Sequence, residues 1–173
     1  MKLAWGNKVS QQFCDRVVWM AKDLHTDPSF LMACMAFETG RSFSASIRNG
    51  GGSGAVGLIQ FMPQTAAGLG TTSEDLAEMS AEDQLRFVWR YFERWRGQLK
   101  NLGDVYMAII WPSGVGKPDS HVLFARDGDR PRTYLANKGL DIDLDGVISR
   151  KETLVKIEAH YREGMAEAMA REL

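Results

Sequence analysis

Several features that would narrow the class of this protein are nearly missing from its sequence. It holds only two cysteines, Cys14 and Cys34, which are too few for a disulfide framework. Both lie in apolar segments with helical spacing, so we expect buried thiols, although they could also meet across a helical hairpin. No run of about 18 apolar residues occurs, and the first 20 residues lack an uninterrupted apolar stretch. We therefore expect neither a membrane span nor a secretory signal.

An excess of charge of either sign is also missing. The chain has 21 basic and 22 acidic side chains, for a formal net charge of -1. This balance predicts neither the basic footprint of a nucleic-acid-binding protein nor an acidic tail. Arg86, Arg90 and Arg94 do share a helix face with aromatic residues nearby, but a solvated face explains them more simply than nucleic acid does. Any partner must therefore be inferred from local sites.

What is present favours a mainly α fold in one domain that spans residues 1–173. Short Gly-, Pro- and Ser-containing stretches separate segments with helical apolar spacing, and no internal repeat is visible. Asp27 and Pro28 begin one helix and Gly40 ends it, while Ser80 with Asp83 resembles an N-cap box. The segments that we expect to be helical are 9–24, 28–39, 63–70, 81–99 and 101–111.

A single carboxylate, Glu38, stands in the last turn of the second expected helix after a run of apolar residues. The negative end of the helix dipole and the apolar neighbours both disfavour the charged form, so the pKa of Glu38 should be raised. A carboxyl that stays protonated near neutral pH is what protonation of a leaving glycosidic oxygen requires. Position alone, however, is explained more simply by a solvated glutamate at a helix end.

A glycine-rich loop follows, and residues 47–61 could contain a small β-hairpin. Its glycines let the backbone approach a ligand, and Ser53 and Gln60 add groups that can bond to hydroxyl and acetamido substituents. No Lys follows the glycines as in a phosphate-binding loop, so nothing favours a nucleotide. The loop suits a polar sugar ring.

The segments "FETGRSFSASIRN", residues 37–49, and "GSGAVGLIQFMPQTA", residues 52–66, resemble the lysozyme-like lytic transglycosylases and goose-type lysozymes, specifically bacteriophage members. The family pattern of Glu, Ser or Thr, and Gly, then Gly-Ala-x-Gly-Leu-x-Gln-x-x-Pro-x-Thr-Ala, is filled throughout. The similarity continues through "DVYMAIIWPSGVGKP" and "YLANKGLDIDLDG", so it covers roughly residues 28–155.

The resemblance implies a lysozyme-like domain that cleaves the β-1,4 bond between N-acetylmuramic acid and N-acetylglucosamine in peptidoglycan. It implies Glu38 as the catalytic residue, and as substrate-binding residues Thr39, Ser53, Gly57, Gln60, Phe61, Tyr106 and Trp111. One segment departs from the family: many members carry Ala-Tyr-Asn-Ala-Gly with a tyrosine at the active site, where this chain has "AIIWPSG". Tyr106 or Trp111 could replace that tyrosine, although each also fits a core position.

The distribution of acids bears on the mechanism, because glycosidases with two carboxylates need a second acid about 5 to 10 Å from the first. No Asp or Glu lies between Glu38 and Gln60, and Glu74 and Asp75 fall where a helix start explains them. This favours a one-acid mechanism in which the substrate's own 2-acetamido or 6-hydroxyl group replaces the protein nucleophile, giving a 1,6-anhydro sugar. The alternative is a hydrolysing muramidase that positions water with Thr39, Ser53 or an acid from elsewhere.

Residues 141–152, "DIDLDGVISRKE", match the EF-hand calcium loop D-x-D-x-D-G-x5-E without a mismatch. In that pattern the ion is bound by side-chain oxygens and one backbone carbonyl, and Ser149 stands at the position that binds through water. The side-chain ligands are Asp141, Asp143, Asp145 and Glu152, and Val147 offers its backbone carbonyl. Gly146 permits the sharp turn. We expect one structural Ca²⁺; the alternative is a solvated acidic turn.

Together these patterns predict a monomeric peptidoglycan-degrading enzyme, an endolysin or virion-associated lysin that binds no nucleic acid and inserts into no membrane. Without a signal peptide it would be made in the bacterial cytoplasm and reach the periplasmic wall through a pore or with a virion. A competing hypothesis is a non-catalytic wall-binding module stabilised by calcium.

Overall fold

The computed structural model describes residues 1–173, and its dominant elements are eight α-helices. Their bounds are α1 Gln11–Leu24, α2 Pro28–Glu38, α3 Pro63–Gly68, α4 Ser73–Glu78, α5 Ala81–Phe92, α6 Leu102–Ile110, α7 Pro131–Asn137 and α8 Arg150–Gly164. Single 3-10 turns lie at Gly6–Lys8 (η1), Glu93–Trp95 (η2), Pro112–Gly114 (η3) and Lys138–Leu140 (η4). The mainly α fold class is thus confirmed. None of the helices combines the length and the apolar composition that a bilayer span needs.

The helix starts lie where the capping residues predict them. Asp27 Oδ1 accepts a hydrogen bond from the Ser29 N–H at 2.7 Å, and Pro28 occupies the first turn of α2. Ser80 Oγ likewise accepts from the Asp83 N–H at 3.1 Å at the start of α5. Each bond satisfies a backbone donor that the first helical turn leaves without a partner.

The expected helix over residues 81–99 is wrong at its C-terminal end. Helix α5 ends at Phe92 and continues only as the 3-10 turn η2. Gly97 takes a positive φ of 75°, and its N–H donates to the Leu24 carbonyl at the end of α1, at 2.9 Å, instead of to a helical acceptor. The chain therefore turns toward α1, while Leu99 still reaches the core.

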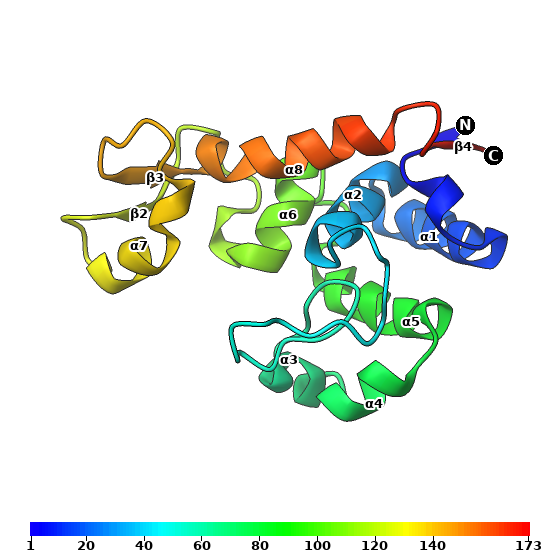
Figure 1. Cartoon of the computed structure of the whole chain (residues 1–173). Coiled ribbons are helices and arrows are strands. Elements are labelled where there is room, and N and C mark those ends of the chain that lie inside the picture. Colours follow the sequence, from blue (N-terminus) through cyan, green and yellow to red (C-terminus); the bar gives the residue numbers. More distant parts are fainter.

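The strands are short and lie outside the glycine-rich loop. Strand β1 (Lys2–Leu3) pairs with β4 (Arg171–Glu172), and β2 (Val122–Ala125) with β3 (Val147–Ser149), both antiparallel. The first pair brings the two chain ends together at one end of α8 (Figure 1). The hairpin expected within residues 47–61 is reduced to isolated bridges of Val56 with Arg48 and with Phe61, because positive φ angles interrupt the extended backbone there.

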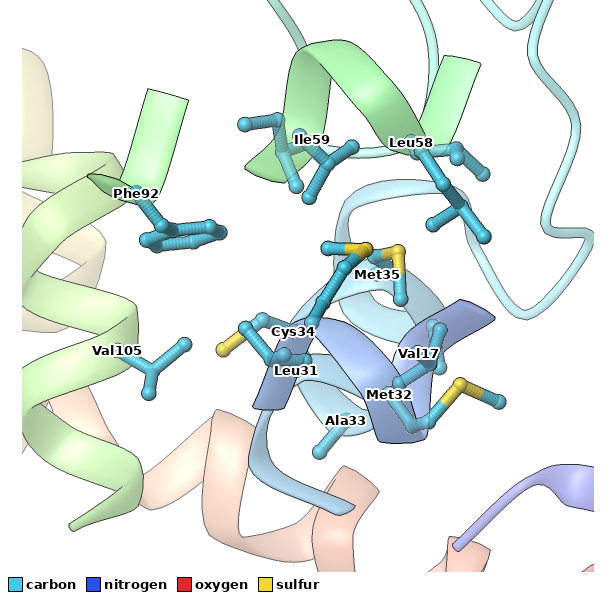
Figure 2. Packing of buried hydrophobic residues seen from close by; sticks show 14 of the residues in the cluster. Val17, Leu31, Met32, Ala33, Cys34, Met35, Leu58, Ile59, Phe92 and Val105 are labelled. Atoms are coloured by element: carbon cyan, nitrogen blue, oxygen red, sulfur yellow. The ribbon is translucent and has the colours of Figure 1, made fainter. Parts of the chain in front are cut away.

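Helix α2 forms the centre of a core cluster of 33 buried residues. All residues from Leu31 to Ala36 are buried, as expected for a helix that is apolar around its whole circumference. Figure 2 shows them enclosed between Phe92 and Val105 on one side and Val17 on the other, with the loop residues Leu58 and Ile59 above. Cys14 and Cys34 are buried free thiols, so they do not pair.

A second, small cluster joins β2, β3 and α7 at the far end of α8 (Figure 1). It consists of Phe124, Tyr134 and Ile148, and it supports the loop of residues 141–152. A buried ion pair ties this region to α6, with Arg150 Nη2 at 3.0 Å from Asp104 Oδ1. The acidic loop is therefore attached to the main core through the first residue of α8.

Candidate functional site

Glu38 is the last residue of α2, where the chain leaves the core for the glycine-rich loop. The Thr39 N–H still bonds to the Met35 carbonyl at 3.0 Å, but Gly40 takes a φ of +56° and ends the helix. The Glu38 side chain is half-buried and makes no hydrogen bond or ion pair within the protein. Its carboxyl group is thus held in an apolar setting with its oxygens free.

Burial raises the pKa of Glu38 to about 7, and no charge of another residue contributes to this rise. The negative charge of Glu38 in turn acts on its neighbours. After their own burial, it is the next cause that raises the pKa of Tyr106 and of Cys34. Near neutral pH a large fraction of Glu38 is therefore a neutral acid that can donate a proton.

Tyr106 is near enough to Glu38 for the charge of that carboxyl group to raise its pKa, after burial. Its ring packs edge-on against Phe37, with centroids 5.5 Å apart, and its hydroxyl makes no hydrogen bond within the protein. Trp111 lies elsewhere: it packs edge-on against Phe124 at 4.5 Å, below the guanidinium of Arg130 at 5.5 Å. Of the two candidates, only Tyr106 is placed next to the carboxyl group.

The glycine-rich loop is fixed to the body of the protein by Gln84 of α5, which is fully buried. Gln84 Oε1 accepts from the Leu58 N–H at 2.7 Å, and Nε2 donates to the carbonyls of Ala45 at 3.0 Å and Leu76 at 2.8 Å. Gly57, with a φ of +81°, allows this approach, because a Cβ there would lie 2.2 Å from Gln84 Oε1. Gly57 therefore shapes the loop rather than presenting a side chain.

Gln60 and Phe61 lie where the loop returns toward α3. Gln60 adopts a positive φ of 52°, and its Nε2 donates to the carbonyls of Gly57 at 3.1 Å and Ile47 at 3.3 Å. Its Oε1 accepts no bond within the protein and stays available to a ligand donor. Phe61 is almost completely buried and packs edge-on against Tyr91, with centroids 6.3 Å apart.

The other two predicted binding residues have different positions. The buried Thr39 hydroxyl donates to the Met35 carbonyl at 2.6 Å and accepts from the Phe43 N–H at 3.0 Å, so its bonding capacity serves the turn after α2. Ser53 is exposed at the tip of the loop, where its Oγ accepts from the Ala55 N–H at 3.3 Å. None of these bonds involves the Glu38 carboxyl group, although Thr39 directly follows Glu38 in the chain.

Two cavities that share lining residues lie along α3, α5 and α6. A small one of about 50 Å³ is lined by Ile59, Gln60, Phe61, Met62, Thr65, Tyr91 and Ile109. A larger groove of about 500 Å³ is lined by Thr65, Gly68, Leu69, Arg90, Tyr91, Arg94, Ile109 and Pro112. Glu38 lines neither, but Tyr91 lines both, and the charge of Glu38 contributes to the raised pKa of Tyr91 after burial of the ring. Tyr91 is thus a residue of both cavities whose pKa responds to the charge of Glu38.

Tyr91 and Gln84 are site residues that sequence reasoning missed. They lie seven residues apart on α5 and so on one helix face, next to the apolar stripe that contains Val88. A glutamine at the margin of such a stripe indicates a buried polar side chain with partners elsewhere in the chain. The sequence alone is enough to suggest that Gln84 is buried and bonded. It does not show which loop Gln84 binds.

The acidic loop brings three predicted ligands together. One carboxylate oxygen from each of Asp141, Asp143 and Asp145 lies within 4.8 Å of the others, so the cluster could hold a metal ion. Asp141 is buried; its Oδ2 accepts from Tyr134 Oη at 2.6 Å and from the Gly146 N–H at 3.0 Å, whereas its Oδ1 is buried without a partner. A buried unpaired oxygen on one of three clustered carboxylates fits a hard cation.

Glu152, the predicted bidentate ligand, makes hydrogen bonds within the protein. Its Oε2 accepts from the N–H and the hydroxyl of Ser149, at 2.8 and 2.7 Å, in a capping box at the start of α8, and its Oε1 accepts from the Ile142 N–H at 2.9 Å. Val147 lies in β3, and its N–H donates to Asp145 Oδ1 at 2.7 Å. Glu152 thus closes the loop onto the helix and does not join the three-Asp cluster.

No protein-family model, no curated protein and no solved structure matches this chain. The function must therefore be inferred from the residues of the site themselves.

Proposed function

We propose that this protein is a peptidoglycan-cleaving enzyme that acts on the β-1,4 bond between N-acetylmuramic acid and N-acetylglucosamine, with Glu38 as its general acid and base. The observation that carries the proposal is the Glu38 carboxyl group. It has a pKa of about 7 caused by burial alone, and its oxygens are free of internal partners. A group that is part acid and part base near neutral pH can serve both steps of glycoside cleavage.

The proposed reaction is that of a lytic transglycosylase. Neutral Glu38 donates its proton to the glycosidic oxygen, and the bond from this oxygen to C1 of the muramic acid breaks as N-acetylglucosamine leaves. The sugar's 2-acetamido group stabilises the cationic C1. Glu38, now a carboxylate, takes the proton of the 6-hydroxyl, whose oxygen bonds to C1 and closes the 1,6-anhydro ring. Each proton that Glu38 gives up is regained, so the enzyme ends as it began.

The electrostatics around Glu38 support one carboxylate rather than two. A second acid close by would raise the pKa of Glu38 through its charge, and no such contribution is present. The nearest alternative from the sequence, Glu74, is exposed on α4 and lies 3.9 Å from the guanidinium of Arg48. The hydrolysing muramidase stays the second candidate, because a water placed by Glu74 or Ser53 would give the same bond cleavage.

Binding of the sugar chain would involve the surface between the loop and α5. The free Oε1 of Gln60 can accept from an acetamido N–H or a hydroxyl, and the Tyr91 ring offers an apolar wall. Tyr106, whose hydroxyl has no internal partner, can contact the sugar or Glu38 itself. Wall binding without catalysis would give the free, protonated Glu38 carboxyl group no chemical role.

We further propose Ca²⁺ as the ion of the acidic loop, held by Asp141, Asp143 and Asp145, since carboxylate oxygens are its preferred ligands. The ion would offset two of the three negative charges of the cluster and fix the loop against α8. It contributes to stability, and no step of the cleavage involves it. We propose the wider setting as expected from the sequence: a monomeric bacteriophage endolysin or virion lysin that acts at the cell wall.

Replacement of Glu38 tests the proposal directly. Glu38→Gln keeps the shape of the side chain but cannot donate a proton, so the rate of cleavage of purified peptidoglycan should fall by at least about 10²- to 10⁴-fold. Glu167→Gln, an exposed change distant in sequence, should leave the rate unchanged. A Glu38→Gln rate within about threefold of the wild type would remove Glu38 from the mechanism.

A further inference from the structure

The groove along α3, α5 and α6 is lined by two arginines that have no acidic partner. Arg90 lies on α5 and Arg94 on the following 3-10 turn η2, and neither forms an ion pair in the structure. The groove of about 500 Å³ has no Asp or Glu in its lining. It therefore presents two uncompensated positive charges in a hollow of the size that small-molecule groups occupy.

Other contacts hold both guanidinium groups in place without neutralising them. Arg90 Nη1 donates to the Leu69 carbonyl at 2.8 Å, which fixes the group against the end of α3. Arg94 stacks over Trp95 at 3.9 Å and lies 5.1 Å from the centre of the Tyr91 ring. Stacking and a single carbonyl bond leave several N–H donors of each group free, in the fork geometry that suits carboxylates.

The groove adjoins the small cavity of the candidate sugar site. It shares Thr65, Tyr91 and Ile109 with the small cavity that Gln60 and Phe61 line. A ligand with a polar ring in the small cavity could thus place an anionic branch in the groove. Arg86 lies on α5 as Arg90 does, but it lines a different cavity, together with Trp19 and Trp89.

We propose that this groove binds the acidic peptide stem of peptidoglycan, with Arg90 and Arg94 as the ligands of its carboxylates; the identity of the ligand rests on the proposed function. Of the parts of the substrate, the N-acetylglucosamine rings are neutral, whereas the stem branches from the muramic acid and carries several carboxylates. Charge-assisted bonds from arginine to a carboxylate are strong and directional. The overall charge of -1 gives a polyanion such as nucleic acid no general attraction.

The test compares cleavage of intact peptidoglycan with cleavage of the same material after an amidase has removed the stems. The wild type should cleave intact chains about tenfold faster, since one or two charge-assisted bonds are worth about that factor or more. The double variant Arg90→Gln/Arg94→Gln should cleave both substrates at the slower rate. The matched control Arg86→Gln, an unpaired arginine on the same helix, should keep the wild-type preference.

Two outcomes separate this inference from the proposed function. Equal cleavage of both substrates by wild type and double variant would overturn the groove assignment and leave the enzyme intact. If neither substrate is cleaved at all, the proposed function fails, and the groove assignment is then tested by a binding experiment. In that case the tripeptide L-alanyl-γ-D-glutamyl-diaminopimelate is titrated into the protein and followed by NMR. Shifts at Thr65 and Ile109 that the double variant loses support the groove; no shifts, or equal shifts with an amidated tripeptide, overturn it.

Discussion

The side chain of Gln84 holds the backbone of Leu58 through a hydrogen bond of 2.7 Å from the Leu58 N–H to Gln84 Oε1. This contact joins α5 to the loop that follows Glu38, across 26 residues of sequence. Both partners are completely buried, so water cannot replace the bond. The position of the loop relative to the candidate catalytic carboxyl group therefore depends on one amide side chain.

Replacing Gln84 by Leu should destabilise the protein strongly. The change leaves two buried backbone groups without partners, the Leu58 N–H and the Ala45 carbonyl, and leaves the Leu76 carbonyl with only the 3.4 Å bond from the Met79 N–H. Each buried unpaired group costs about 1–3 kcal/mol, so a loss of about 3 kcal/mol or more is expected in urea unfolding. Gln64→Leu on the exposed face of α3 is the control, with an expected change below about 0.5 kcal/mol. Equal midpoints for the two variants would contradict this role of Gln84.

Some features of the fold and of the candidate site can be predicted from short sequence patterns, because they depend on residues that are close together in the chain. The start of α2 follows from Asp27 and Pro28, since the cap and the fixed φ act within one turn. The raised pKa of Glu38 also follows, because an acid at the end of an apolar helix must lie near the core. These features need only residues that are neighbours along the chain.

Other features depend on partners that are distant in sequence. The end of α5 is set by the bond from the Gly97 N–H to the Leu24 carbonyl, and β1 pairs with β4 from the opposite end of the chain. Glu152 fits a bidentate metal ligand by position, yet its oxygens accept from Ser149 and Ile142. No local periodicity encodes these pairings, so they became visible only in three dimensions.

The pH dependence of stability should report the protonation of Glu38. Its pKa is about 7 in the native state and near the ordinary value of 4.5 in the unfolded chain. Between these values the native state binds more protons than the unfolded state, so this group lowers the free energy of unfolding as pH rises through the window. The loss is complete above about pH 8 and amounts to about 3 kcal/mol.

Glu38→Gln should therefore be more stable than the wild type at high pH. The neutral amide has no charged form to desolvate, so we expect a gain of about 3 kcal/mol at pH 8.5 and of less than about 1 kcal/mol at pH 5. Urea unfolding at the two pH values measures the difference, with Glu167→Gln as the exposed control. A gain that does not change with pH would show that the carboxyl group is not buried as described.

Calcium should raise the melting temperature of the protein, and EDTA should reverse the effect. A ligand that binds only the native state stabilises it by about 2.7 kcal/mol when its concentration is 100 times the Kd. Asp143→Asn should abolish most of this gain, because it removes one charge from the three-Asp cluster while the residue stays exposed. Asp129→Asn, an exposed change outside the cluster, should keep it. A melting curve that calcium does not move in the wild type would leave residues 141–152 as an acidic turn only.

The product of cleavage distinguishes one carboxylate from two. If Glu38 acts alone, the 6-hydroxyl of the muramic acid must supply the nucleophile, and an intramolecular hydroxyl has a large effective molarity over water. Mass spectrometry of the released fragments should then find 1,6-anhydromuramic ends, about 18 mass units lighter than hydrolysed ends because one water is missing. Fragments that carry only reducing muramic ends would show that water is the nucleophile. Such a result would keep Glu38 as the acid and require a separate base, for which Glu74 is the first residue to replace.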